Sequence, residues 1–308
     1  ARDGPHPGEL GELGDRGGQV GSGEDEMIQH GQDTSVDLVA DARVNGRRVS
    51  YLRRGAGEPL LLLQGMGGHH QFWTDPFLEL LEPHFDVVAP DHRGIGASDR
   101  ADEPFSIADL ADDAAGLIAE LGWPGAHVFG ISLGGMVAQE LVLRHPGAVR
   151  TLAIGCSTAG GSAGIDPEVP RRVVAAMATR NAELALRVSF EANLSPAYAA
   201  DPGHFDTFKA TSLAVKVPSV VAGMQFQAAL AHDTRDRLPT VSAPTLVLHG
   251  TADEMLGSAQ GELIAGLVPG ARLELFDGVG HLFWWEQPER AAALLRDHAT
   301  AGSAAAGR

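Results

Sequence analysis

Ser132 is the first of three side chains in this 308-residue chain that suit a nucleophilic mechanism. It lies in Gly130-Ile131-Ser132-Leu133-Gly134, directly after an apolar strand pattern and directly before a helical pattern. A sharp strand-to-helix turn exposes the serine oxygen, and its flanking positions must be glycine because a Cβ there would collide with nearby backbone. A serine hydroxyl is a poor nucleophile at neutral pH, so it needs a base to take its proton and an acid to orient that base.

Asp253 and His281 are the candidates for that acid and base. Asp253 follows an apolar strand pattern in LVLHGTADEM, and His281 follows the last strand pattern in DGVGHLFWWEQPER. Taken singly, such an aspartate is more often a turn residue and such a histidine is more often exposed. Together with Ser132 they occur in the chain order Ser, Asp, His, each just after a strand, and the ends of parallel strands meet at one sheet edge. The sequence therefore predicts a catalytic triad.

A second serine, Ser162, also lies in a Gly-x-Ser-x-Gly pattern at residues 160–164. The chain holds 39 glycines, so the bare pattern is weak evidence. This copy follows its strand by several residues and leads into Asp166-Pro167 rather than directly into a helix. We expect Ser162 to belong to a flexible loop.

Alternating strand and helix patterns predict an α/β fold with a mostly parallel sheet and helices on both faces. Asn45-Gly46 separates the first two strands and favours a tight hairpin, so the sheet begins antiparallel. The expected strands are Val36–Val44, Arg47–Arg53, Leu60–Leu63, Phe85–Ala89, His127–Phe129, Thr151–Ile154, Thr245–Leu248 and Leu273–Phe276. The expected helices among them include Ile107–Leu121, Met136–Arg144 and Gly261–Val268.

The connection from Thr158 to Val241 is far longer than a crossover helix requires. Helical patterns at Pro167–Thr179, Ala182–Ala192 and Ser219–Ala231 give it structure of its own. Their apolar stripes, which include Met177, Phe190, Met224 and Phe226, either pack this segment onto the core or form a wall of a substrate pocket.

The domain organisation follows from these patterns. Residues 1–35 are rich in glycine and acidic side chains and are expected to be a disordered tail. Met27, just before the first strand pattern, is the expected start of the natural product. The core is expected at 36–157 and 240–299, the helical insert at 158–239, and a flexible tail of small residues at 300–308.

Composition excludes several classes of function. With 40 Asp and Glu against 23 Lys and Arg, the net charge of −17 argues against a nucleic-acid or anionic-membrane partner. A single cysteine, Cys156, forms neither an intrachain disulfide nor a thiolate zinc cage. His69 and His70 have no carboxylate at ligand spacing, so neither a metal nor a cofactor is expected. The chain lacks a long apolar stretch and a secretory signal pattern, so a soluble, cytoplasmic protein is expected.

The chain resembles the α/β-hydrolase superfamily over about Val36 to His298. The resemblance is carried by GISLGG around Ser132, HGTADE around Asp253, GVGH at His281, and DHRGIGASD at residues 91–99. It implies an eight-stranded sheet whose first strands are antiparallel, and a helical lid between strands six and seven that corresponds to the long insert.

The resemblance also implies where the remaining site residues lie. The oxyanion hole would be formed by the backbone N–H groups of Leu133 and Met66. Gln64-Gly65 replaces the family's usual His-Gly pair, so the hydrogen bonding within that loop needs another explanation. The expected substrate-binding side chains are those of Ile131, Met177, Met224 and Phe283.

Within the superfamily, a serine at this turn disfavours haloalkane dehalogenases and epoxide hydrolases, which use a carboxylate nucleophile. The motifs are most similar to those of enol-lactonases and small carboxylesterases. The predicted activity is therefore hydrolysis of a small-molecule carboxylic ester or lactone through an acyl-serine, without a cofactor. Carbon–carbon bond hydrolases, haloperoxidase-like members, a non-hydrolytic cyclase and a receptor-like ligand-binding module remain open as alternatives.

Overall fold

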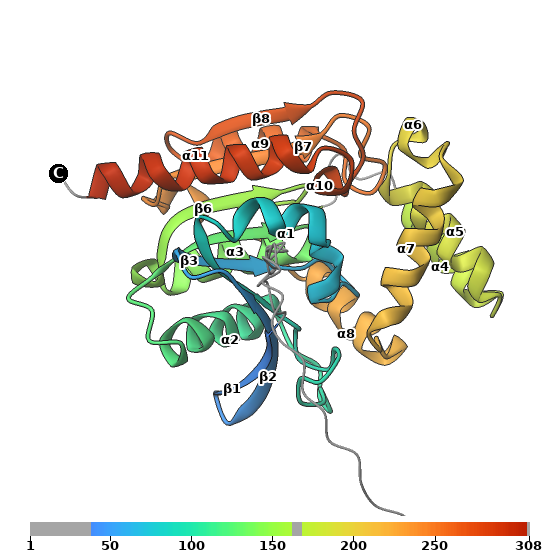
Figure 1. Ribbon diagram of the computed structural model, residues 1–308, viewed down its shortest axis with the longest axis horizontal. Helices are drawn as coiled ribbons and strands as arrows, with labels where there is room; N and C mark the ends of the chain where they lie inside the picture. Colours follow the sequence, from blue (N-terminus) through green and yellow to red (C-terminus); the bar gives the residue numbers. More distant parts are fainter. Residues whose placement is uncertain (1–37, 162–167, 307–308) are drawn as a thin grey trace, which may run out of the picture. The chain divides into compact units, whose positions relative to one another are not determined.

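The computed structural model describes residues 38–161 and 168–306. Its centre is an eight-stranded sheet with the strand order β1-β2-β4-β3-β5-β6-β7-β8 (Figure 1). The strands are β1 Leu38–Val44, β2 Arg47–Arg54, β3 Glu58–Leu63, β4 Phe85–Pro90, β5 Ala126–Ile131, β6 Val149–Gly155, β7 Thr245–Gly250 and β8 Arg272–Phe276. Each strand expected from the sequence is present, with ends shifted by a few residues, and the α/β fold class is confirmed.

The direction of the strands determines where the site can form. Asn45 and Gly46 both have positive φ, 49° and 79°, and turn β1 back onto β2 in antiparallel register. β2 also pairs antiparallel with β4, and every later pairing in the sheet is parallel. The carboxyl ends of β5, β6, β7 and β8 therefore open onto the same edge of the sheet.

Alternate strand residues point to opposite faces of the sheet, so apolar side chains lie on both faces. Helices cover both of these faces. In β3, Leu61 and Leu63 belong to one core cluster, whereas Leu60 and Leu62 belong to the other. The first cluster packs under α2 Ile107–Glu120, α3 Leu133–Arg144 and α9 Ala259–Leu267, and the second under α1 Asp75–Leu81 and α11 Pro288–Ala306. The sheet therefore lies between two hydrophobic layers.

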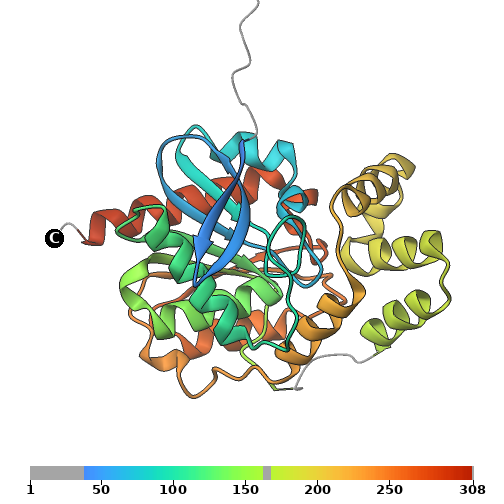
Figure 2. The same ribbon diagram turned by 90° about the horizontal axis from the view of Figure 1, so that it is seen from below.

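A helical insert lies between β6 and β7. Its described helices are α4 Glu168–Ala178, α5 Ala182–Asn193, α6 Pro196–Ala199, α7 Pro202–Ala214 and α8 Ser219–Leu230. The yellow and orange ribbons of the insert lie beside the sheet core in both Figure 1 and Figure 2. The sequence patterns predicted α4, α5 and α8, whereas α7, which buries Phe205 and Phe208, was not predicted.

The expectation of a flexible tail from residue 300 is wrong for residues 300–306. Helix α11 continues to Ala306, because alanine is a strong helix former and glycine fits where the helix meets the sheet. A Cβ on Gly302 would lie 2.1 Å from Thr151 Cγ2, so glycine permits this close approach to β6. Residues 1–37, 162–167 and 307–308 lie outside the described part, and with them the expected N-terminal tail, Met27 and Ser162.

The remaining short helices are η1 His70–Trp73, η2 Pro146–Ala148, η3 Leu238–Thr240 and α10 Phe283–Glu286.

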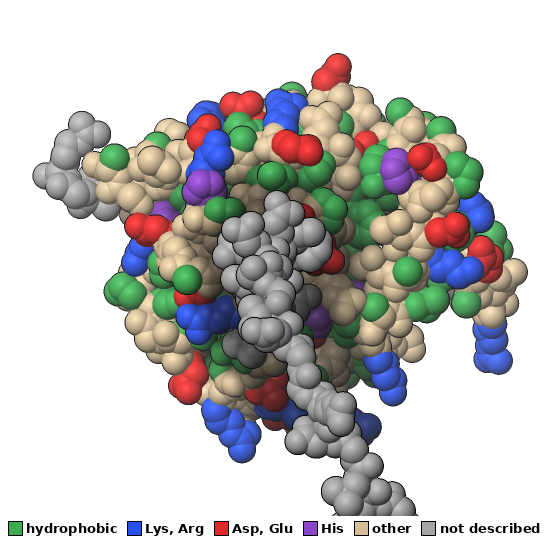
Figure 3. Space-filling view, viewed as in Figure 1, with side chains coloured by type: hydrophobic (Ala, Val, Ile, Leu, Met, Phe, Trp, Pro, Cys, Tyr) green, Lys and Arg blue, Asp and Glu red, His purple; other side chains and the backbone are tan. Residues whose placement is uncertain are grey.

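Among the described residues, no single helix is both long and apolar enough to cross a membrane. The pair α7 and α8, bent by 98°, passes that test by combined length and composition alone. On the face shown in Figure 3, acidic and basic side chains are interspersed over the described surface.

Candidate active site

Ser132 occupies a strained turn between β5 and α3. Its φ of 54° and ψ of −119° are unusual for a residue with a side chain, and its N–H donates a 2.9 Å hydrogen bond to Gly155 O at the end of β6. A Cβ on Gly130 would lie 2.1 Å from Gly134 O, and one on Gly134 would lie 2.0 Å from Leu63 O. The steric reason for glycine on both sides of the serine is therefore visible in the structure.

Asp253 and His281 meet on the loops that follow β7 and β8. His281 Nδ1 lies 2.7 Å from Asp253 Oδ2, and both residues are buried, with 4% and 6% of their surfaces exposed. The other carboxylate oxygen, Oδ1, accepts the backbone N–H groups of Met255 and Leu256 at 2.8 and 3.0 Å. The loop of Asp253 thus holds the carboxylate in place independently of its contact with the imidazole.

A second buried histidine, His249 of β7, also contacts this carboxylate. Its Nε2 lies 2.6 Å from Leu256 O and 3.2 Å from Asp253 Oδ2. A carbonyl oxygen can only accept, so Nε2 carries a proton and also faces the carboxylate as a donor. Burial by itself would raise the pKa of Asp253, but the electrostatic interaction with His281 and the hydrogen bonds from both histidines hold that pKa far below its usual range.

The loops that carry the acid and the base pack tightly on each other and on the insert. A Cβ on Gly250 would lie 2.2 Å from Gly280 O, so the end of β7 touches the histidine loop directly. Glu286 Oε1 accepts the N–H groups of Gly280 and Ser195 at 2.9 and 2.8 Å, and its Oε2 accepts the Ser195 hydroxyl at 2.6 Å. One carboxylate thus connects the histidine loop to the insert.

Cys156 connects the nucleophile to the acid and base. It follows Gly155, the acceptor for Ser132 N–H, and its φ is 38°. Its Sγ, an oxygen of Asp253 and a nitrogen of His281 all lie within 4.8 Å of one another. The N–H of Ser132 is therefore hydrogen-bonded to the last residue of β6. The next residue along the chain, Cys156, lies against the Asp253–His281 pair.

The same three side chains are a donor set that could in principle hold a metal ion. Burial, followed by the negative charge of Asp253, raises the pKa of the Cys156 thiol well above its usual range. The thiol is therefore protonated at neutral pH, and the facing nitrogen and oxygen of His281 and Asp253 are already hydrogen-bonded to each other. The arrangement suits proton transfer better than metal binding.

The loop after β3 lies beside the nucleophile. A Cβ on Gly65 would lie 3.2 Å from Ser132 Cβ and 3.8 Å from its Oγ. Within the described part of the chain, the backbone N–H groups of Met66 and Leu133 donate no hydrogen bond. Both amides predicted to form an oxyanion hole are thus free to donate.

The residues predicted to bind substrate have different positions. Phe283 is fully buried and stacks on Phe276 with their ring centroids 4.7 Å apart, and Ile131 is 1% exposed in the same core cluster. Both side chains are core residues, and their contact with substrate stays a prediction. Met224 is half-buried on α8 against the other cluster. Met177 belongs to α4, and its side chain lies outside the described part of the structure.

His69 and His70 also differ from each other. His70 Nδ1 lies 3.0 Å from Asp91 Oδ2, and this carboxylate is supplied by the DHRGIGASD loop rather than by a residue near in sequence. His69 is fully buried, and burial lowers its pKa to about 4. In the described structure, neither histidine hydrogen-bonds to Ser132, Asp253 or His281.

Four residues near the site were missed in the sequence: His249, Cys156, Gln225 and Glu286. His249 stands within the HGTADE motif, which could have drawn attention to it. Cys156 follows a strand end, as Ser132 does. Nothing local distinguishes Gln225 or Glu286, since their contacts depend on how the insert docks.

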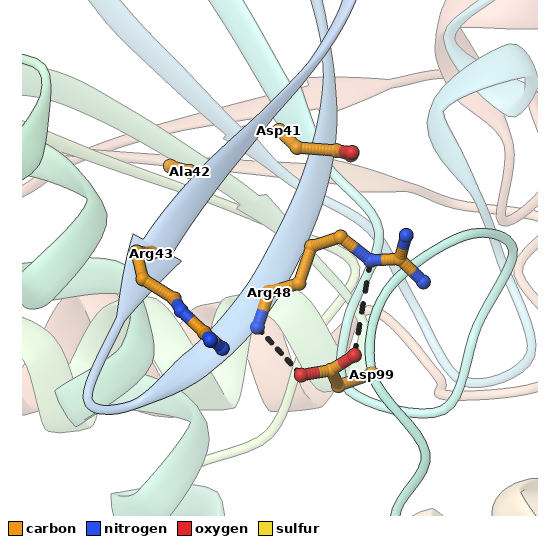
Figure 4. Close-up of a pocket in the computed structure, with 5 residues that line it drawn as sticks. All are labelled: Asp41, Ala42, Arg43, Arg48 and Asp99. Carbon is orange, nitrogen blue, oxygen red and sulfur yellow. Dashed lines mark hydrogen bonds and ion pairs between the residues drawn. The ribbon is translucent and has the colours of Figure 1, made fainter.

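A pocket of about 540 Å³ lies away from these residues, on β1, β2 and the loop after β4 (Figure 4). It is lined by Asp41, Ala42, Arg43, Arg48 and Asp99. Arg48 N donates to Asp99 Oδ2 at 2.8 Å, and the two side chains form a half-exposed ion pair. The lining includes none of Ser132, Asp253 and His281.

A family model described as the alpha/beta hydrolase fold matches residues 58–288, so the chain belongs to the α/β-hydrolase family. Among its relatives is the putative carbamate hydrolase RutD of Azorhizobium caulinodans, 32% identical over 236 residues, which are 76% of this chain and 88% of that protein. The chain is therefore an enzyme of the α/β-hydrolase class.

Solved structures give the same family. Est816, an N-acyl homoserine lactone degrading enzyme, superposes with a TM-score of 0.71 at 28% identity, over 84% of this chain and 99% of that one. The enol-lactonase from Burkholderia xenovorans LB400 superposes with a TM-score of 0.73 at 25% identity, over 85% and 100% of the two chains. The resemblance to the esterase and lactonase group is thus confirmed at the level of family and fold.

Proposed function

We propose that the chain is a serine hydrolase that cleaves a carboxylic ester or lactone through an acyl-serine intermediate. The observation that carries the proposal is the buried Asp253–His281 pair, 2.7 Å apart, at the sheet edge where Ser132 is held in a left-handed turn. The lactone-cleaving enzymes among the structural neighbours support the choice of substrate class.

The proposed reaction assigns a separate role to each group. His281 Nδ1 is engaged with Asp253, so Nε2 takes the proton of Ser132 as Oγ attacks the carbonyl carbon. The N–H groups of Met66 and Leu133 stabilise the negative oxygen of the tetrahedral intermediate. The alcohol leaves with the proton from His281, and water then releases the acid from the acyl-serine by the same route.

A fluorophosphonate tests the activated serine without requiring the natural substrate. The Ser132 oxygen bonds to phosphorus, fluoride leaves, and His281 takes the hydroxyl proton. We expect intact-mass analysis to detect one adduct in the wild-type protein and in Ser162→Ala, and none in Ser132→Ala. An adduct that persists in Ser132→Ala, or its absence from the wild type, would contradict the proposal.

Carbamate hydrolysis is the second candidate, favoured by the likeness to the putative carbamate hydrolase RutD. It uses the same acyl transfer with a nitrogen leaving group, so the triad suits both. Rates with matched p-nitrophenyl esters, small lactones and a carbamate of the same size would rank them. We expect kcat/KM to be highest for an ester or lactone, and a higher value for the carbamate would reverse the order. Carbon–carbon cleavage would be detected with a vinylogous diketone.

A further inference from the structure

The loop of residues 64–68 has an unusual pattern of backbone hydrogen bonds. Gly65 N donates to Gln64 Oε1 at 3.0 Å, and Gly67 N donates to Gln225 Oε1 at 2.8 Å. Gly68 N donates to Gly65 O at 3.1 Å. The N–H of Met66 lies between these two amides along the chain. It has no hydrogen-bond partner in the described structure. The loop is thus fixed on both sides of the Met66 amide.

Gln225 is not part of the sheet core. It lies on α8 of the insert, 158 residues from Gly67, and its surface is fully buried. Its Oε1 is occupied by Gly67 N, whereas its Nε2 has no partner in the described part of the chain. A buried amide with an unpaired nitrogen is costly, and a methionine of similar length would avoid that cost. In return, Gln225 Oε1 accepts a hydrogen bond from Gly67 in the loop of residues 64–68.

Helix α8 is itself anchored to the core at this place. A Cβ on Gly94 would lie 2.6 Å from Val221 Cγ2, so the loop after β4 touches α8 directly. Just before α8, Lys216 O accepts the N–H of Gly96 at 3.1 Å. The position of Gln225 Oε1 is therefore set by how the insert docks, and Gly67 follows it.

We infer that Gln225 is a positioning residue through which the insert aims Met66 N–H at the oxyanion. Gly67 has a φ of 68°, a region that glycine enters freely, so without an acceptor for its N–H the peptide can rotate and Met66 can turn away. Docking of the insert would then complete the oxyanion hole. The inference rests on the proposed function, because it needs an oxyanion to stabilise.

The test compares three variants of the full-length chain with the wild type. Gln225→Met keeps the length of the side chain but removes the acceptor, whereas Gln225→Glu keeps an acceptor oxygen at that position. Gln227→Met alters an exposed glutamine of the same helix and is the matched control. Each protein is titrated with a fluorophosphonate to count active sites. Then kcat and KM for p-nitrophenyl acetate and the Ki of a trifluoromethyl ketone are measured.

Loss of an oxyanion donor costs about 10²–10³ in kcat, so a donor that is misaimed rather than removed should cost about 10–100-fold. We expect that loss in Gln225→Met, with KM changed less than about threefold and Ki raised in parallel, because only the oxyanion-bearing states need the Met66 donor. Gln225→Glu should recover most of kcat, and Gln227→Met should match the wild type.

If Gln225→Met lowers only the melting temperature, with kcat per titrated site and Ki unchanged, Gln225 is structural and the inference is wrong. If Gln225→Met does not fold, Gln225→Asn makes the same test, because it withdraws the acceptor by one methylene. Failure of the proposed function is separate, since the wild type itself would then neither react with the fluorophosphonate nor hydrolyse the ester.

Discussion

The two ends of the candidate site are built in different ways. At the acid end, the carboxylate of Asp253 has hydrogen bonds from two backbone amides and contacts with His249 and His281, all from the loops and strands of the core. At the oxyanion end, the loop around Met66 is held partly by Gln225 of the insert. Both oxygens of the Asp253 carboxylate have partners, whereas both glutamine side chains that hold the oxyanion loop have an unpaired amide nitrogen in the described structure.

This difference indicates which half of the site can change without unfolding. A carboxylate with several donors on a rigid sheet edge has a fixed geometry. A loop whose alignment depends on an inserted helix follows any movement of that helix. Perturbing the insert should therefore alter the oxyanion end first, whereas perturbing Asp253 should remove catalysis without altering the fold.

Replacing Asp253 by asparagine should have the largest effect. The amide would offer its N–H₂ to His281 Nδ1 and select the wrong tautomer, so kcat should fall by roughly 10⁴. Steady-state kinetics on p-nitrophenyl acetate measures the loss, and circular dichroism checks the fold. Asp297→Asn, at an exposed site on α11, is the control. A loss below about tenfold would show that Asp253 is not the triad acid.

Acid should destabilise the insert side through two buried histidines, His69 and His232. Burial lowers the pKa of each to about 4, and the His232 ring has no hydrogen-bond partner in the described structure. A pKa depressed in the folded state means stability that is present above the unfolded value near 6.5 and is lost as the pH falls toward 4. Each should therefore contribute a loss of about 2 kcal/mol between pH 7 and 4.5.

Urea unfolding of the wild type and of His232→Leu at those two pH values measures the effect. The difference in unfolding free energy between pH 7 and 4.5 should be smaller in His232→Leu by about 2 kcal/mol. His84→Leu, which replaces an exposed histidine after α1, should leave the difference unchanged. An equal pH dependence in the wild type and in His232→Leu would refute the assignment.

His249 should contribute a smaller effect at the acid end, through the basicity of Asp253. Without a donor 3.2 Å from Oδ2, the carboxylate would hold the protonated imidazole of His281 more firmly. His249→Met should therefore shift the acidic limb of the kcat/KM profile to higher pH and lower kcat/KM about tenfold at pH 6. His249→Gln, which keeps a donor near Nε2, should restore the profile. Loss of stability without a shift of that limb would indicate a packing role alone.

The parts of the fold that could be predicted from the sequence were those determined locally. Strand and turn patterns are short-range, so all eight strands and the strand-to-helix turn at Ser132 were identified. The order Ser132, Asp253, His281 predicts that the three side chains share one sheet edge because parallel strands bring their ends together, and Asp253 and His281 do meet there. The helical end of α11 was missed because its small residues were interpreted as flexible, although alanine also favours a helix.

Contacts made between distant segments could not be predicted. Gln225 and Gly67 meet only because α8 docks on the loop after β3, and no local pattern encodes that docking. Ile131 and Phe283 are close in sequence to Ser132 and His281, but neighbouring strand and helix positions point to different sides. Both side chains therefore lie in the core.

The smallest predicted effect lies where the insert meets the histidine loop. Glu286→Gln keeps one acceptor oxygen for Gly280 and Ser195 but replaces the charged partner of the Ser195 hydroxyl with a neutral amide. The unfolding free energy should fall by about 1 kcal/mol, and kcat should change less than about threefold because His281 is still held by Asp253. Urea unfolding and p-nitrophenyl acetate kinetics measure the two quantities. A tenfold loss of kcat would mean that the insert controls the acid and base as well as the oxyanion loop, and the two ends would then not differ as inferred.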